Sequence, residues 1–265
     1  MPPATFLGQT PHLIGMVHVG ALPGTPRHTD PLPAIIDAAV RDARVIADAG
    51  FDAIVIENMH DVPYLRRDVG PEVVAAMTRV GAAVRAAVDL PLGVQILAGA
   101  NHAALAVAHA IDAQFIRAEG FVFAAVADEG LLDEADAGPL LRYRRAIGAD
   151  AVRILADVKK KHSAHAITAD VDIAETARAA VFSGADGVIV TGVATGGAVE
   201  TEDLTATRDA IDQPLLVGSG ATPETARALL KHADGIIVGS AIKTDGDWRR
   251  EVDVDRATRF VASAR

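Results

Sequence analysis

Short apolar runs alternate along the chain with longer segments in which apolar residues recur every three or four positions. In 34–49, Ile35, Ala39, Ala43 and Ile46 fall on one stripe, as in an amphipathic helix packed against a core. The short runs are rich in Val and Ile and lack alternating polar positions, which is typical of buried parallel strands. The pattern therefore predicts strands that alternate with covering helices.

Eight strand–helix units fit this pattern. We predict strands at 12–17, 53–57, 92–97, 115–118, 152–157, 186–191, 214–218 and 235–239. We predict helices at 34–49, 71–88, 101–112, 138–147, 171–183, 201–210, 222–232 and 253–263. Eight such units in 265 residues predict an α/β fold, a (β/α)8 TIM barrel that forms a single domain over residues 1–265.

The alternative fold is a doubly wound open sheet. That fold would need fewer units or a glycine-rich first turn, and residues 15–24 do not follow the Gly-x-Gly-x-x-Gly pattern. No low-complexity linker or long charge run divides the chain. We therefore prefer the barrel.

In a barrel of this kind the active site lies at the carboxyl ends of the strands, and this rule selects the candidate residues. The expected catalytic residues are Glu57, Glu119, Asp157 and Lys159. The expected substrate-binding residues are His18, Asn58, Gln95, Arg117 and Asp128. Asp157 and Lys159 are two apart on an extended segment, so we expect them to meet in the barrel mouth. A structural ion pair of Arg117 with Glu57 or Glu119, and a surface salt bridge at Lys159, are the alternatives.

Glycine-rich turns follow the last three strands and predict a phosphate site, because glycines let backbone N–H groups approach an anion. The expected phosphate-binding residues are Thr191, Gly192, Gly218, Ser219, Gly220, Gly239 and Ser240. Thr195, Gly196 and Gly197 either add donors or form a flexible loop. The alternative is tight turns without a ligand. The segment 239–243 could also begin a short extra helix.

No cofactor and no metal are expected. The chain has no cysteine, which excludes disulfides and thiolate metal sites. His18, His60 and Glu57 are the candidate metal ligands, but their spacing matches no common metal motif.

Charge and hydropathy narrow the partners and the location. The net charge of −10 argues against nucleic acid. No apolar run is long enough to span a membrane, and residues 1–10 do not read as a secretory signal, so we expect a cytoplasmic homo-oligomer without membrane partners. The chain has 25 Asp against 10 Glu and 20 Arg against 5 Lys. This balance predicts a halophilic protein, and a high-GC genome is the alternative explanation.

Several motifs together resemble the BtpA/SgcQ family over nearly the whole chain. They lie at 13–26, 56–64, 115–121, 156–162, 191–196 and 218–222. The resemblance implies a TIM barrel related to phosphate-binding barrels. One cyanobacterial branch of that family is linked to photosystem I accumulation, and other members lie beside sugar-metabolism genes. The chain departs from the family at Glu119, where many members have Asn.

These observations predict an enzyme that acts on a phosphorylated sugar or a nucleoside. The preferred reaction is glycosyl transfer by a pentosyltransferase, the phosphorolysis of a nucleoside to ribose 1-phosphate and base. An aldolase, isomerase or epimerase of sugar phosphates is the close alternative. A non-enzymatic assembly factor is the third possibility, and the polar strand ends argue against it.

Overall fold

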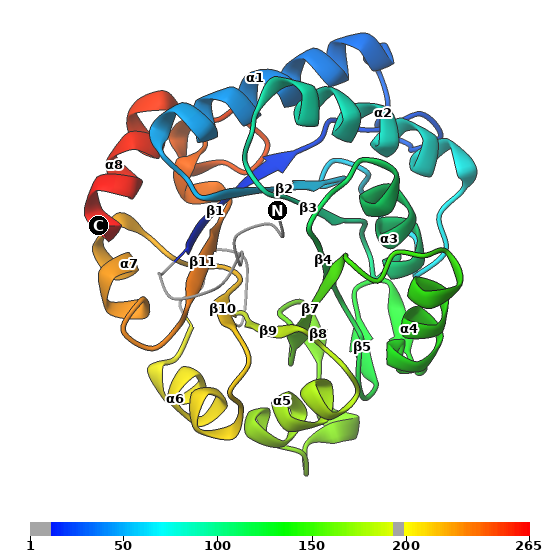
Figure 1. The fold of residues 1–265 in the computed structure, drawn as a ribbon, viewed down its shortest axis with the longest axis vertical. Coiled ribbons are helices and arrows are strands. Elements are labelled where there is room, and N and C mark those ends of the chain that lie inside the picture. The colour runs from blue at the N-terminus through cyan, green and yellow to red at the C-terminus, as the bar shows by residue number, and fades with distance from the viewer. Residues whose placement is uncertain (1–11, 193–198) are drawn as a thin grey trace.

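A computed structural model of the chain describes residues 12–192 and 199–265 and confirms the TIM barrel (Figure 1). Eight parallel strands close in the order β1-β11-β10-β9-β7-β4-β3-β2. The barrel strands are β1 (His12–His18), β2 (Ala53–Glu57), β3 (Leu92–Gln95), β4 (Phe115–Ala118), β7 (Arg153–Val158), β9 (Gly187–Val190), β10 (Leu215–Val217) and β11 (Gly235–Val238).

Eight α-helices surround the strands and follow them along the chain (Figure 1). They are α1 (Leu32–Ala49), α2 (Pro71–Ala87), α3 (Asn101–Ala110), α4 (Ala137–Ala146), α5 (Ile173–Phe182), α6 (Thr201–Ala210), α7 (Pro223–Leu229) and α8 (Val254–Ala264). Several of the predicted elements are too long. Strand β3 stops at Gln95, since the N–H of Leu97 turns away and donates to Asn58 Oδ1 at 2.8 Å.

The inside of the barrel is filled by its own side chains. An inner cluster packs there and comprises Ile14, Met16, Ala53, Val55, Phe115, Leu155, Ile189, Leu216 and Ile237. Gly93 makes room for Phe115, because a Cβ at Gly93 would lie 2.3 Å from its ring. The larger apolar cluster lies between the strands and the helices. The barrel interior is therefore a packed core and not a channel, so a ligand must bind beyond this core, at an end of the barrel.

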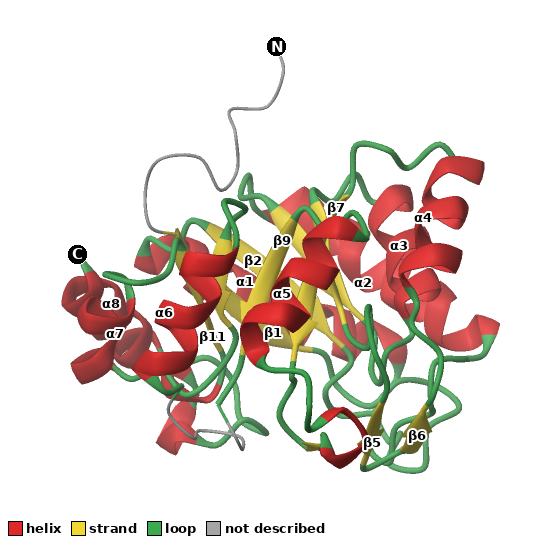
Figure 2. Cartoon of the chain, turned by 90° about the horizontal axis from the view of Figure 1, so that it is seen from below, coloured by secondary structure: helices red, strands yellow, loops and turns green. Residues whose placement is uncertain are grey.

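A small antiparallel sheet lies outside the barrel and was not predicted. Its strands are β5 (Ala125–Ala127), β6 (Gly130–Leu132) and β8 (Ser163–Ala164), with a 3-10 turn η1 (Ala166–Thr168) after β8. The sheet joins the loop after β4 to the loop after β7, and Figure 2 shows β5 and β6 at the lower end of the molecule. It forms one wall of the barrel mouth.

The loop after β11 contains two 3-10 turns, η2 (Ser240–Ile242) and η3 (Thr244–Gly246). The first is the predicted short extra helix. An ion pair holds this loop against α1. Lys243 is fully buried, and its Nζ lies 2.7 Å from Asp42 Oδ2. Asp42 also accepts the N–H of Val252 at 2.9 Å. Across the described ranges, no helix is long and apolar enough to cross a membrane.

Candidate active site

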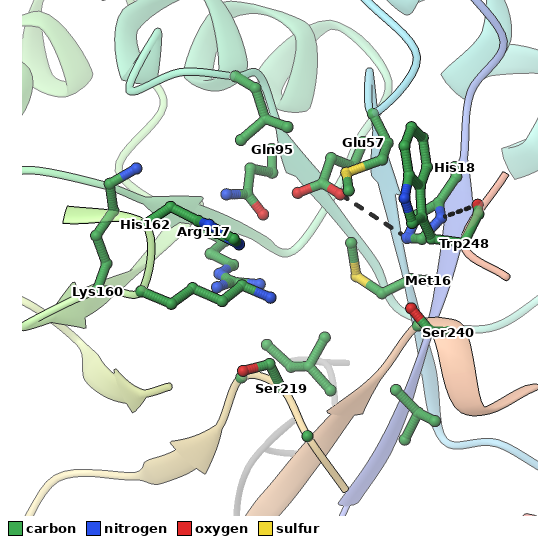
Figure 3. Close-up of a pocket in the computed structure, with 18 of the residues that line it drawn as sticks. Met16, His18, Glu57, Gln95, Arg117, Lys160, His162, Ser219, Ser240 and Trp248 are labelled. Atoms are coloured by element: carbon green, nitrogen blue, oxygen red, sulfur yellow. Dashed lines mark hydrogen bonds and ion pairs between the residues drawn. The ribbon is translucent and has the colours of Figure 1, made fainter. Parts of the chain in front are cut away.

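A cavity of about 470 Å³ opens at the carboxyl ends of the barrel strands (Figure 3). Its walls come from the ends of β1, β2, β3 and β4, from the loop after β7 and from the glycine turns after β10 and β11. Strand register aligns part of this wall, since His18 pairs with Glu57 and Glu57 pairs with Gln95. The cavity therefore lies where the strand-end rule predicted it.

His18 is held in one tautomer. Its Nδ1 lies 2.8 Å from the carbonyl oxygen of Trp248, which can only accept, so Nδ1 carries the proton. Burial, and then the charge of Lys243, lower the pKa of His18 to about 3, so the ring is neutral. Its Nε2 is consequently an acceptor, and it lies 3.9 Å from Glu57 Oε2 (Figure 3).

Glu57 has the pKa of a neutral-pH acid–base group. Burial raises the pKa of Glu57 to about 7, against the lowering effect of Arg117, and the charge of Glu119 adds to the rise. A carboxyl group with this pKa can both give and take a proton near neutrality. Glu57 is therefore the strongest acid–base candidate in the cavity.

Arg117 pairs with Asp157, not with either glutamate. Its Nε donates to both carboxylate oxygens of Asp157 at 3.1 and 3.2 Å, and both side chains are buried. Burial raises the pKa of Asp157, and Arg117 opposes this rise. Asp157 does not line the main cavity but a small neighbouring one of about 30 Å³. It orients Arg117, which does line the main cavity.

Asp157 and Lys159 do not meet in the main cavity, because both line the small neighbouring cavity instead. Lys159 has a left-handed backbone (φ 46°), so the alternation of an extended strand ends before it. Its amine donates to the carbonyl oxygen of Thr168 at 3.0 Å, outside the main cavity.

The two following lysines reach the main cavity, and sequence reasoning missed them. Lys160 Nζ lies 3.3 Å from Glu119 Oε1. Lys161 is half-buried in the wall, and burial, followed by the charge of Arg117, lowers its pKa. Three of the five lysines stand at 159–161 in a lysine-poor chain, and this signal could have singled out the whole run.

The glycine turns offer backbone donors to the cavity. The N–H of Gly218 is bonded to Val190 O. By contrast, no acceptor within 12–192 or 199–265 takes the N–H groups of Ser219, Gly220, Ala221, Ser240 and Ala241. All five residues line the cavity. Backbone N–H groups in such positions need a partner, so the turns are suited to an anion.

The turns also lie close to the polar side chains. A Cβ at Gly218 would lie 3.2 Å from Arg117 Nη2, and one at Gly239 would lie 3.3 Å from His18 Nε2. Figure 3 shows Ser219 and Ser240 across the cavity from Gln95. An anion at the turns would therefore be within reach of a guanidinium group.

Gln95 and Glu119 form the opposite wall. Gln95 Nε2 donates to Glu119 Oε1 at 3.4 Å. Gln95 Oε1 and Glu119 Oε2 are buried without a protein partner in the described part of the chain. Two such acceptors can receive the donors of a ligand.

The remaining predicted residues have other positions. Asn58 does not line the cavity. It accepts the N–H of Leu97 and donates to Asp61, which in turn accepts the N–H of Leu22, so it ties the loops after β1, β2 and β3 together. Thr191 and Gly192 lie behind the cavity wall, where Thr191 Oγ1 accepts the N–H of Lys161. Asp128 lines the cavity from the turn between β5 and β6. The predicted donors at 195–197 lie outside the described residues.

Sequence reasoning also missed Trp248, Met16 and Tyr64, which line the cavity. Trp248 is far beyond the end of β11, so the strand-end rule could not find it. No group of three His, Asp or Glu side chains in the described ranges is arranged to hold a metal ion.

The family model for the BtpA family matches residues 9–265. The chain belongs to the BtpA family. An uncharacterised mitochondrial protein of Caenorhabditis elegans is 45% identical over 256 residues, covering 95% of this chain and 92% of that protein. The photosystem I biogenesis protein BtpA of Synechocystis is 38% identical over 259 residues, covering 97% of this chain and 88% of that protein.

Solved structures support the barrel independently. Thiamine phosphate pyrophosphorylase of Pyrococcus furiosus has a TM-score of 0.59 at 18% identity, covering 96% of this chain and 95% of that chain. N-(5′-phosphoribosyl)anthranilate isomerase of the same organism has a TM-score of 0.57 at 11% identity, covering 96% and 98%. The BtpA-family chain therefore shares its fold with named enzymes.

Proposed function

We propose that this BtpA-family protein is a pentosyltransferase that cleaves a nucleoside with inorganic phosphate, giving ribose 1-phosphate and the free base. One observation carries the proposal: backbone donors suited to an anion and a carboxyl group with a pKa near 7 share one cavity. Phosphorolysis needs both, since phosphate attacks the sugar and the base needs a proton to leave.

The positions of these groups suit an attack from one side. Phosphate at the turns 218–221 and 239–241 would approach C1′ of the ribose, with Arg117 and Lys161 adding positive charge. The base would lie across the cavity, against Gln95 and Glu119, which are neighbours in the cavity wall. The ribose would lie between them, beside Glu57 and His18.

Glu57 would serve as the general acid. The C1′–N bond breaks, the base takes the proton of Glu57, and a phosphate oxygen forms the new bond to C1′. The proton that the phosphate then loses restores Glu57. His18 Nε2, which lies 3.9 Å from Glu57 Oε2, would accept a hydrogen bond from a ribose hydroxyl placed beside Glu57.

The names of the structural neighbours agree with a phosphate-bearing ligand, since both refer to phosphorylated compounds. The name of the Synechocystis relative refers to photosystem I biogenesis. A role in assembly alone would not require Glu57, His18 and Lys161 to converge in one cavity, so we favour the enzyme.

A second candidate rests on Lys161. Lys161 lines the cavity and burial lowers its pKa, and a lysine of this kind can form a Schiff base with the carbonyl group of a sugar phosphate. An aldolase or isomerase would use it in this way. Phosphorolysis needs Lys161 only as a positive charge.

The experiment incubates the purified protein in molar KCl with each common nucleoside, with and without phosphate, and measures ribose 1-phosphate and free base. We expect cleavage that depends on phosphate. Pentose phosphates with borohydride form the second arm, with Lys161→Ala and the matched control Lys159→Ala. A covalent adduct lost only in Lys161→Ala, without any phosphate-dependent cleavage, would establish the Schiff-base reaction instead.

A further inference from the structure

A second cavity, of about 620 Å³, lies behind the first one, between α1 and the loops that follow β1 and β11. The two cavities share His18 and Trp248, which line both of them. The proposed reaction uses only the first cavity.

Arginines converge on the second cavity from three separate segments. Arg27 comes from the loop after β1, Arg41 from α1, and Arg249 and Arg250 from the loop after β11. Their convergence does not follow from a local repeat in the sequence. It is also unusual in a chain with a net charge of −10.

Most of the arginine charge in this cavity remains available. Arg249 is held by Asp247 at 2.8 Å, while Arg27, Arg41 and Arg250 form no ion pair within the described residues. Three acidic residues also line the cavity, namely Asp30, Asp42 and Glu251.

These acids compensate the arginines only in part. Asp42 is occupied by Lys243 at 2.7 Å and by the N–H of Val252. Glu251 accepts the hydroxyl of Thr244 at 3.4 Å. The charge of Asp42 is neutralised by Lys243, and that of Arg249 by Asp247. Three arginines without an ion pair in the described part of the chain then face two carboxylates, Asp30 and Glu251, so the formal charge of the cavity is positive.

We propose that the second cavity binds the phosphate group of an organic phosphate. Guanidinium groups bind phosphate oxygens through paired hydrogen bonds, and several arginines from different elements can surround one phosphate. The phosphate has two conceivable sources. It is carried either by the substrate itself, whose nucleoside then lies in the first cavity, or by a separate effector.

Trp248 connects the two cavities. Its ring centroid lies 5.1 Å from that of His60 on the side of the second cavity, and its carbonyl oxygen accepts a hydrogen bond from His18 Nδ1–H. A ligand held by Arg27 and Arg41 would therefore share its cavity with the residue that fixes the tautomer of His18. Trp248 is the single tryptophan of the chain, so its fluorescence reports on this part of the cavity lining.

The test titrates adenosine 5′-monophosphate into the full chain and follows both calorimetric heat and Trp248 fluorescence. Arg27→Gln and Arg41→Gln should each raise the Kd at least tenfold. Arg44→Gln is the matched control, because Arg44 is exposed on the same helix but lies outside the cavity. It should leave the Kd unchanged. The variants are at exposed positions, so folding should be preserved.

Further arms separate the first cavity and the two sources. Gly220→Val alters the phosphate turn of the first cavity. This variant should still bind adenosine 5′-monophosphate in the second cavity, and adding Arg41→Gln to it should weaken that binding. Competition by adenosine indicates a phosphate on the substrate, and simultaneous binding of adenosine indicates an effector. Equal affinity in the wild type and Arg41→Gln, or equal losses in Arg41→Gln and Arg44→Gln, would overturn the proposal. The measurement needs no catalysis, so absence of phosphorolysis would not affect it.

Discussion

At the scale of single residues, the proposed acid Glu57 lowers the stability of the fold as the pH rises. Its pKa is about 7 in the folded protein against an ordinary value of 4.5. Between these values the folded state holds a proton that the unfolded chain has released, so stability is lost as the pH rises through this range. Burying an ionised Glu57 above pH 7 therefore destabilises the fold.

We predict that Glu57→Gln raises the melting temperature relative to the wild type at pH 8 but not at pH 4. The same change should lower the rate of base release by about 10²-fold or more, because the acid is lost. Calorimetry across the pH range measures the first effect. Glu175→Gln, at an exposed position on α5, is the control. A difference in melting temperature that is independent of pH would contradict the assignment.

His18 should act through Nε2 alone. In His18→Asn the amide N–H can still donate to the Trp248 carbonyl oxygen, but Oδ1 takes the place of Cδ2, so no acceptor remains at the position of Nε2. We expect kcat to fall by about 10²-fold while KM changes little. Steady-state kinetics would show this split, and a rise in KM alone would mean that His18 only binds substrate.

The sequence could place side chains at strand ends but could not follow the chain beyond them. Glu57 and Gln95 line the cavity because the register of their strands fixes them. Lys159 does not line it, since its φ of 46° breaks the extended alternation on which the prediction depended. Trp248 enters the site from a loop whose path depends on a buried ion pair made with α1.

At the scale of elements, the turn after β10 depends on Gly220, which has a φ of +76°. Gly148, in the turn before β7, has a φ of +73° and open space around a Cβ. Gly→Ala should cost about 1 kcal/mol of stability at either position, since only glycine adopts this conformation freely.

Only Gly220→Ala should also weaken phosphate binding, by about tenfold, because only that turn presents donors to the cavity. Calorimetric titration with inorganic phosphate compares the two variants. Equal phosphate affinity in both would remove the turn after β10 from the anion site.

Long periodic elements could be predicted well, and short ones could not. Helix α6 spans residues 201–210 as predicted, whereas the helix predicted at 222–232 ends at Leu229. The bonds from Lys231 to Ala228 and from His232 to Leu229 tighten that end into a different turn. The strands of the small sheet have two or three residues, which is too short for any periodicity to be recognised.

At the scale of the whole molecule, the acidic surface should respond to salt. The chain has a net charge of −10 and an excess of Asp over Glu. Salt screens the repulsion between like charges on the surface. We expect the melting temperature to rise between low and molar KCl, as measured by differential scanning calorimetry. A constant or falling melting temperature would leave base composition of the genome as the explanation.

The C-terminal residue is fastened at the end of the barrel opposite the mouth. Arg265 donates to Gly50 O at 2.9 Å and pairs with Asp52 at 2.8 Å, just before β2 begins. The cavities open at the other end of the same strand, at Glu57 and beyond. A protein immobilised on a surface through a C-terminal tag would therefore present its mouth to the solvent, which suits flow-cell measurements of ligand binding.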